Sequence, residues 1–327
     1  FTKKINTIMK KKNTTKKNLA YGNFLMANYE FSGKNYEKEL DYLLKGHQNF
    51  LESNVYNFKK EINYWLNLLP KYEDLFNINN SKKIIKEAPH LIQPIFIVGV
   101  PRCGSTLIEK IISSGEKPIS TGEETGIISS FIKSKIMNKE SLNSEIENFQ
   151  IELVKKFTER NILNPNSNYT FTDKTLDNFF YIALIKKVFP KAKIVHCRRS
   201  PISSIISILK NNMPTLHWAH NLDNIFEYFD IYHRTIDRYN KTLPNYIYNL
   251  ELEKLSNNPM LESKKLMQYC NLPWSTKCLE FHKRKDLVSR TTSNLQVRKA
   301  IYKHSTIERN PYKVFLEKYE KKYSWFK

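Results

Sequence analysis

The chain has 327 residues, of which 40% are hydrophobic and 13% aromatic. This composition excludes an intrinsically disordered protein and is sufficient for one large domain or two unequal ones. The 53 lysines and arginines outnumber the 32 acidic residues, which gives a formal net charge of +21. Such a balance favours an anionic cofactor, an acidic acceptor, nucleic acid or an anionic membrane surface, although lysines scattered over solvated faces would produce it too.

The four cysteines, Cys103, Cys197, Cys270 and Cys278, have neither CxxC spacing nor a metal-binding pattern. We therefore expect free thiols in a reducing compartment and no metal site. Neither a signal-peptide core nor an apolar run of membrane-spanning length is present, so we expect a cytoplasmic location and no transmembrane segment in this stretch. The numbering opens at Phe1, which leaves open whether an anchor or further repeats lie upstream.

Helices are predicted over residues 18–29 and 35–49, on either side of the turn Ser32-Gly33-Lys34. This pair is similar to one tetratricopeptide unit, and a single pair cannot bury both of its faces. A further helix over 51–76 should break at Pro70. With a polar connection as the boundary, we expect a helical tetratricopeptide-like region over residues 1–90 and a second domain over residues 91–327.

The chain is organised around residues 93–114. The short, mostly β-branched run 95–98 predicts a buried parallel strand, and the apolar residues of 107–112 recur at helical spacing. The turn GVPRCGST between them can hold a phosphate with its backbone N–H groups and the helix N-terminus. The spacing nearly matches the Walker A motif, but Ser105 replaces its lysine. This argues against an ordinary ATPase or kinase and leaves Arg102 as the cation of the loop.

An acidic turn, Thr121-Gly122-Glu123-Glu124, follows between a short predicted strand and a new helix. Thr121 and Glu124 satisfy a capping box, in which case Glu124 would only start the helix. In the functional interpretation, one carboxylate of the pair Glu123 and Glu124 instead accepts a proton from a hydroxyl.

Two further strand ends carry cations. The predicted strand 169–172 ends in Asp173-Lys174, and ligands of open α/β sheets bind beyond the carboxyl ends of strands. The predicted strand 193–197 leads into Arg198-Arg199, followed by Ser200 as a helix cap. This corner predicts a second anion site.

The loop 211–222 contains three rings, His217, Trp218 and His220, which make it a candidate acceptor wall or lid. Each histidine alone is more often a packing or hydrogen-bonding residue than a catalyst, and the loop has no metal-ligand spacing.

These motifs together resemble the sulfotransferases that use 3′-phosphoadenosine 5′-phosphosulfate (PAPS). FIVGVPRCGSTLIEKII is similar to their 5′-phosphosulfate loop, and GEET, DK and RRSP follow in the family's order. The resemblance runs from about Gln93 to about Arg309 and includes protein-tyrosine sulfotransferases and bacterial sulfotransferases preceded by tetratricopeptide repeats. It implies an α/β fold, a P-loop-like three-layer domain with a central parallel sheet.

The resemblance also implies roles for individual residues. The catalytic residues it implies are Glu124, Lys174, Arg102 and Ser293. The nucleotide-binding residues it implies are Arg102, Cys103, Gly104, Ser105 and Thr106 for the 5′-phosphosulfate, Arg199 and Ser207 for the 3′-phosphate, and Arg298 as a further phosphate contact. PAPS is then the donor, 3′-phosphoadenosine 5′-phosphate (PAP) the product, and no metal is required. The acceptor carries a hydroxyl, on a peptide or a small molecule, and GEET favours tyrosine or another phenol.

The sequence departs from the family at several positions. Ser200 replaces the usual Asp, and Glu308 stands where relatives carry a basic residue, for which Lys303 or Arg309 is the expected substitute. Two other functions stay open: an ATP- and magnesium-dependent P-loop phosphotransferase, for which only Asp173 is a metal-binding candidate, and a tetratricopeptide-type interaction protein with an inactive nucleotide site. Nucleic-acid binding rests on charge alone and ranks last. The acceptor, the choice of base and the oligomeric state are left open.

Overall fold

The structure is a computed structural model that describes residues 2–54, 56–72, 92–117, 119–138, 146–164, 169–284, 286, 301 and 312–326. The chain forms two compact units. The first comprises Phe1–Lys60, Ser200–His233 and Ser305–Lys327, and the second Glu61–Arg199 and Arg234–His304. The polar connection predicted to separate two domains lies outside the described residues, so the division at residue 90 stays a prediction.

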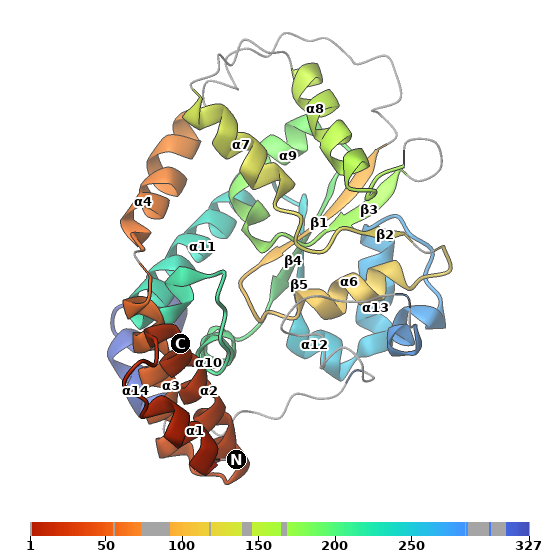
Figure 1. Ribbon diagram of the computed structural model, residues 1–327. Coiled ribbons are helices and arrows are strands. Elements are labelled where there is room, and N and C mark those ends of the chain that lie inside the picture. Colours follow the sequence, from red (N-terminus) through yellow and green to blue (C-terminus); the bar gives the residue numbers. More distant parts are fainter. Residues whose placement is uncertain are drawn as a thin grey trace. The chain divides into compact units, whose positions relative to one another are not determined.

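The second unit is built on a five-stranded sheet in the order β2-β3-β1-β4-β5, in which every neighbouring pair is parallel (Figure 1). The strands are β1 Gln93–Gly99, β2 Ser120–Thr121, β3 Thr170–Asp173, β4 Lys193–Arg198 and β5 Ile247–Glu251. Every residue of the central strand β1 beyond Gln93 is buried, as expected for a parallel strand with both faces covered. Because the strands are parallel, their carboxyl ends meet at one edge of the sheet.

Helices cover both faces of this sheet. On one side lie α6 (Ser105–Ser113), α12 (Leu252–Asn257) and α13 (Pro259–Tyr269), and on the other lie α7 (Ile127–Met137), α8 (Ile146–Glu159) and α9 (Ile182–Val188) (Figure 1). Within the first group α6 packs on α13, and within the second α8 packs on both α7 and α9. The predicted three-layer α/β fold with a central parallel sheet is confirmed.

The first unit is helical where the structure describes it. It contains α1 (Thr2–Met9), α2 (Lys16–Ser32), α3 (Tyr36–Glu52), α10 (Pro201–Leu209) and α14 (Tyr312–Glu320), while α4 (Phe58–Asn63) and α11 (Leu222–Thr242) contribute residues to both units. The predicted N-terminal helix pair is present as α2 and α3, which pack against each other. Its tetratricopeptide-like character stays a prediction.

Pro70 does not break the helix where a break is predicted. Helix α4 continues through a π-helical turn, Tyr64–Leu68, and helical backbone extends to Tyr72. In that turn the Leu69 N–H donates to the Tyr64 carbonyl oxygen, five residues back. The wider turn makes room in front of the proline ring, which would crowd the preceding turn of a regular α-helix.

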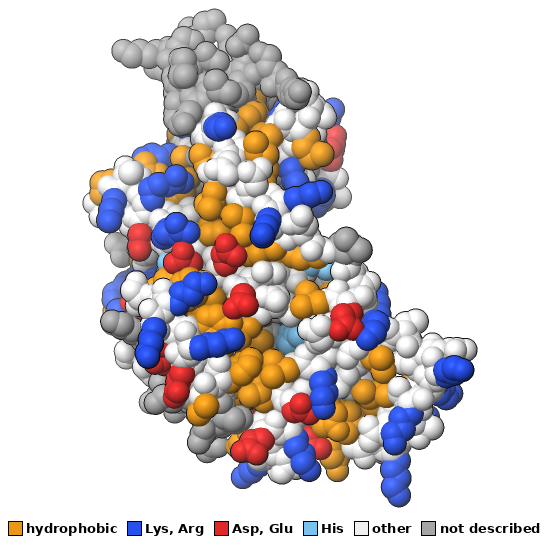
Figure 2. Space-filling view, turned by 90° about the vertical axis from the view of Figure 1, so that its left-hand side faces the viewer, with side chains coloured by type: hydrophobic (Ala, Val, Ile, Leu, Met, Phe, Trp, Pro, Cys, Tyr) orange, Lys and Arg blue, Asp and Glu red, His pale blue; other side chains and the backbone are white. Residues whose placement is uncertain are grey.

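The basic side chains do not gather in one patch on the face that Figure 2 shows. Lysines and arginines are scattered there among acidic and hydrophobic groups. This distribution favours the interpretation that much of the +21 charge lies on solvated faces. In the part of the chain that the structure describes, no helix is long and apolar enough to cross a bilayer.

Candidate functional site

The loop between β1 and α6 has a tight backbone geometry that needs glycine. Gly104 has φ +99°, and a Cβ built on it would lie 2.8 Å from Leu252 Cδ1. A Cβ on Gly99 would lie 2.8 Å from the Cys197 carbonyl oxygen. Arg102, with φ 70°, also adopts the left-handed conformation, which is uncommon for a residue with a side chain. The turn predicted from two glycines and a cation is therefore a closely packed one.

Helix α6 begins directly after this turn. Ser105 and Thr106 form its buried start, and the helix has no side-chain cap among the residues described. The first N–H groups of any α-helix lack intrahelical acceptors, and the helix dipole adds partial positive charge at this end. The predicted nucleotide-binding residues 102–106 thus lie together where an anion would be stabilised.

Arg199 connects the second strand end to this loop. It follows β4, the neighbour of β1, and its Nη1 donates to the Arg102 carbonyl oxygen at 2.9 Å. The two predicted anion-binding corners therefore lie side by side within the second unit. Ser207 lies on α10 in the first unit, and its predicted pairing with Arg199 stays a prediction. Ser200 occupies the N-cap of α10 but makes no side-chain capping hydrogen bond within the described structure.

Cys103 and Cys197 meet at the predicted phosphate loop, which comprises residues 99–106. All four cysteines lie in the described ranges, where each is buried and forms no disulfide. The hydrogen bond between the two thiols lowers the pKa of Cys103, whereas burial raises the pKa of Cys197. Cys103 therefore belongs to the packed base of the loop.

Lys174 and Glu124 form an ion pair at the end of β3. The Lys174 side chain is completely buried, and its Nζ lies 3.2 Å from Glu124 Oε1. The Glu124 side chain is 57% exposed, so its carboxylate remains open to a molecule arriving from solvent. A buried cation and an accessible carboxylate next to each other can stabilise developing negative charge and accept a proton, respectively.

The capping box expected at Thr121 and Glu124 does not form. Thr121 lies in β2, and α7 begins only at Ile127, with Gly126 in the left-handed conformation at its N-cap. The Thr125 hydroxyl oxygen instead accepts the Ile127 N–H at 3.0 Å. Glu124 is thus a loop residue rather than a helix-start residue.

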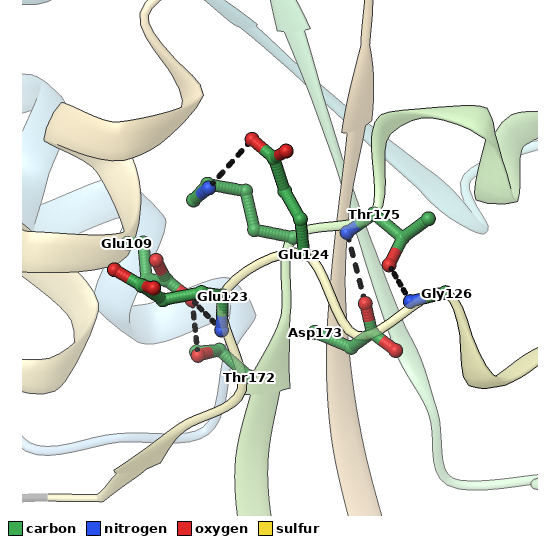
Figure 3. Close-up of polar contacts among 8 residues, drawn as sticks. Glu109, Glu123, Glu124, Gly126, Thr172, Asp173 and Thr175 are labelled. Carbon is green, nitrogen blue, oxygen red and sulfur yellow. Dashed lines mark hydrogen bonds and ion pairs between the residues drawn. The ribbon is translucent and has the colours of Figure 1, made fainter. Parts of the chain in front are cut away.

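Glu123 and Glu124 point in different directions (Figure 3). The Glu123 side chain extends toward Glu109, away from the Glu124 carboxylate. The backbone of Glu123 is paired on both sides: its N–H donates to Glu109 Oε1 at 3.2 Å, and its carbonyl oxygen accepts the Lys174 N–H at 2.7 Å. Of the two rival bases, Glu124 is therefore the one whose carboxylate meets Lys174.

A buried carboxylate, Asp173, holds the end of the loop that follows Glu124. Its Oδ2 accepts the Thr125 hydroxyl at 2.6 Å and its Oδ1 accepts the Thr175 N–H at 2.8 Å. Burial raises the pKa of Asp173. Asp173 was predicted as the neighbour of Lys174 and as a metal-binding candidate, whereas its structural contacts and the role of Glu109 were not predicted. Their signal is the threonines at 125, 172 and 175, whose hydroxyls hydrogen-bond around these carboxylates.

Two further predictions concern the ring-containing loop 211–222 and the C-terminal tail. Two of the three rings of loop 211–222 do not belong to an exposed wall, because Trp218 and His220 are each only 3% exposed. His220 stacks on Phe50 at 3.9 Å and Trp218 on Tyr228 at 3.9 Å, so both are core residues of the first unit. The tail residues implied to contact or neighbour the nucleotide lie outside the described residues: Ser293, Arg298, Lys303, Glu308 and Arg309.

Comparison with known families decides what this arrangement belongs to. The profile of the sulfotransferase family matches residues 94–276, more than half of the chain. The chain belongs to the sulfotransferase family. The matched range contains the phosphate loop, Glu124, Lys174, Arg199 and Ser207, so the expected family is confirmed through the same motifs that predicted it.

Individual relatives are more distant. An uncharacterized protein of Aquifex aeolicus (strain VF5) is 26% identical over 330 residues, which cover 95% of this chain and 42% of that protein, so the chain spans less than half of its length. The sulfotransferase domain from the Synechococcus PCC 7002 olefin synthase is 17% identical with a TM-score of 0.44, over 64% of this chain and 84% of that one. Sulfotransferase STF1 from Mycobacterium tuberculosis H37Rv is 12% identical with a TM-score of 0.39. This match covers 87% of this chain and 90% of that one.

Proposed function

We propose that this sulfotransferase-family chain transfers the sulfuryl group of PAPS to a hydroxyl-bearing acceptor and releases PAP. One observation carries the proposal: the phosphate loop and the Lys174–Glu124 pair follow the adjacent parallel strands β1 and β3, at the edge of the sheet where open α/β folds bind ligands. The spacing of the motifs and their resemblance to PAPS-dependent enzymes support the same function.

The residues present fit the two charged ends of the donor. The amides of residues 103–106 and the Arg102 side chain would hold the 5′-phosphosulfate, because the start of α6 lacks a side-chain cap in the described structure and its backbone approaches closely at Gly104. Arg199, which already contacts the loop, would hold the 3′-phosphate with Ser207. Ser293 and Arg298 would add contacts implied by the resemblance.

PAPS supplies an activated sulfuryl group that passes to the acceptor oxygen in a direct in-line displacement. Glu124 accepts the proton of the acceptor hydroxyl as that oxygen bonds to sulfur. The bond between sulfur and the 5′-phosphate oxygen breaks, and its electron pair stays on that oxygen. Lys174, Arg102 and the loop amides stabilise this charge, and the whole site acts mainly by positioning and electrostatics.

The acceptor is proposed by class. The exposed Glu124 carboxylate suits any hydroxyl that can approach from solvent, such as peptidyl tyrosine, a glycan or a small alcohol. The GEET motif favours tyrosine or another phenol, because it resembles that of protein-tyrosine sulfotransferases. A screen of these acceptor classes with labelled PAPS would decide among them.

The contacts of Asp173 weigh against an ATP- and magnesium-dependent phosphotransferase. Both of its carboxylate oxygens accept hydrogen bonds from within the chain, and the residue is fully buried. Asp173 was the only metal-binding candidate in that function, which also lacks the Walker lysine. The intact Lys174–Glu124 pair likewise argues against an inactive site.

A thermal-shift experiment tests the proposal. PAP at about 100 times its dissociation constant should stabilise the protein by about 2.7 kcal/mol, which raises the melting temperature by several degrees, and ATP with Mg²⁺ should do so much less. Arg102→Gly removes the cation but tolerates the left-handed backbone, so it should reduce the PAP shift without unfolding the loop. A larger shift with ATP and Mg²⁺, or none with PAP, would contradict the proposal.

A further inference from the structure

Glu109 is a buried carboxylate in the second turn of α6, the helix that follows the phosphate loop. It is only 2% exposed. Its Oε1 accepts two hydrogen bonds, from the Thr172 hydroxyl at 2.8 Å and from the Glu123 N–H at 3.2 Å (Figure 3). A carboxylate is tolerated at such a depth only when its oxygens are well hydrogen-bonded, so these two contacts matter for the folded site.

The contact with Glu123 fixes an unusual backbone conformation. Glu123 has φ 52°, in the left-handed region that glutamate rarely adopts. Such a residue persists when its surroundings hold it. Here Glu109 holds the N–H of Glu123, and the backbone N–H of Lys174 holds its carbonyl oxygen. The preceding Gly122 N–H is bonded to the Thr172 carbonyl oxygen at 2.9 Å.

This conformation determines where the next side chain points. Glu123 turns the chain so that Glu124 extends to Lys174, and Asp173 secures the loop beyond it through Thr125. If Glu109 no longer accepted the Glu123 N–H, the left-handed conformation would lose one of its two backbone contacts. Glu124 would then be free to leave the ammonium group of Lys174.

We infer that Glu109 is a positioning residue of the transfer site: through the Glu123 backbone it sets the Glu124 base against Lys174. Because Glu109 belongs to α6, it also ties the loop of the base to the helix that opens at the phosphate loop. The inference rests on the proposed function for its catalytic consequence, whereas its geometric consequence can be observed directly.

Three variants separate positioning from simple packing. Glu109→Gln keeps an oxygen that can accept both hydrogen bonds, whereas Glu109→Leu has a similar size and accepts neither. Ser113→Ala is the matched control: Ser113 is buried on the same helix, and among the described residues its hydroxyl donates to the carbonyl oxygens of Glu109 and Lys110 of that helix. All three are compared with the unmodified chain by PAP thermal shift and by transfer from PAPS to 4-nitrophenol, a probe phenol.

Glu109→Leu should lower kcat by about tenfold or more, since a displacement of about 1 Å at a reacting group can cost that much or more. The KM for PAPS and the thermal shift caused by PAP should stay within about twofold. Glu109→Gln should restore at least about half of kcat, and Ser113→Ala should behave like the unmodified chain. Equal loss in the Gln and Leu variants, or an unchanged kcat in Glu109→Leu, would overturn the inference.

Crystal structures of Glu109→Leu and Glu109→Gln give an answer that does not depend on the acceptor. In the Leu variant, Glu124 should leave hydrogen-bond reach of Lys174 Nζ and Glu123 should leave positive φ, while the Gln variant should keep both. An intact ion pair in Glu109→Leu would refute the inference even if PAP binds. Failure of the unmodified chain to bind PAP would instead refute the proposed function.

Discussion

Replacing Lys174 is expected to have a larger effect on turnover than replacing any other single side chain. It is a fully buried cation at a strand end, and its ammonium group contacts an exposed carboxylate. Lys174→Met keeps most of the volume but removes the charge, so kcat should fall by about a hundredfold or more while PAP still binds. Steady-state transfer from PAPS to a phenol measures this effect.

Lys135 provides the matched control for Lys174. It too has its Nζ 3.2 Å from a glutamate, Glu152 of α8, but it lies on the surface helix α7. Lys135→Met should leave kcat within about twofold, because this part-buried pair joins α7 to α8 and does not lie at the end of a strand. Similar losses in the two methionine variants would show that the Lys174 effect is not specific to the site.

Substitutions of the two glutamates of the acidic turn should have clearly different effects on kcat. Glu124→Gln removes the only carboxylate of the pair that meets Lys174 and should lower kcat by about a hundredfold or more. Glu123→Gln should retain most activity, because the Glu123 side chain points away from the Glu124 carboxylate and the substitution leaves the backbone hydrogen bonds of Glu123 in place. The pH dependence of kcat for both variants checks the assignment, and the reverse order of losses would make Glu123 the base.

Sequence motifs identified Glu124 and Lys174 as candidates but could not reveal why Glu124 points at Lys174. The carboxylate that holds the turn, Glu109, bonds to residues 14 and 63 positions away in the chain. Hydrogen bonds over such separations follow from the order of the strands and leave no spacing pattern in the sequence. For the same reason, the hydrogen bonds of Asp173 could not be predicted from the sequence.

At the level of elements, buried strands were the easiest to predict. The predicted strands 95–98 and 193–197 correspond to β1 and β4 within two residues at either end, since short runs rich in Ile and Val are typical of buried parallel strands. Helix ends were harder. The Thr121 capping box is absent because hydrogen bonds of Thr125 with Asp173 and with the Ile127 N–H start α7 later. Here tertiary contacts override a local signal.

A histidine pair within the first unit predicts how its stability depends on pH. The Nδ1 atoms of His47 and His220 lie 3.0 Å apart, and each Nε2 faces a backbone carbonyl oxygen, that of Leu209 or Met213. Two neutral rings carry two protons, so they can satisfy two of these three contacts at once. Burial lowers the pKa of His47 to about 4 and that of His220 to about 3, so the folded state keeps both rings neutral at pH 7.

The unfolded chain takes up protons on these rings near pH 6.5, while the folded chain resists until about pH 4 or below. The free energy of unfolding should therefore fall as the pH drops from 7 to 5, by about 1–2 kcal/mol for each histidine. Burial raises the pKa values of Glu109 and Asp173, which act in the opposite direction. Urea denaturation at both pH values should show a smaller loss for His47→Gln than for the unmodified chain, and an equal loss would contradict the prediction.

For the whole molecule, family and fold class could be predicted because several motifs occur in a fixed order along residues 94–276. The division into compact units could not be predicted from the sequence, because the first unit combines the N-terminal helices with Ser200–His233 and the C-terminal segment. Arg199 and Ser207 fall in different units, so their shared role toward the 3′-phosphate stays a prediction.

A crystal structure of the complex with PAP tests the central claim most directly. The account predicts that the 5′-phosphate contacts the backbone N–H groups of residues 103–106 beside Arg102, and that the 3′-phosphate contacts Arg199. The Lys174 ammonium group should lie within hydrogen-bond distance of the 5′-phosphate. A nucleotide bound with its phosphates away from both corners, or with its 5′-phosphate remote from Lys174, would contradict the account.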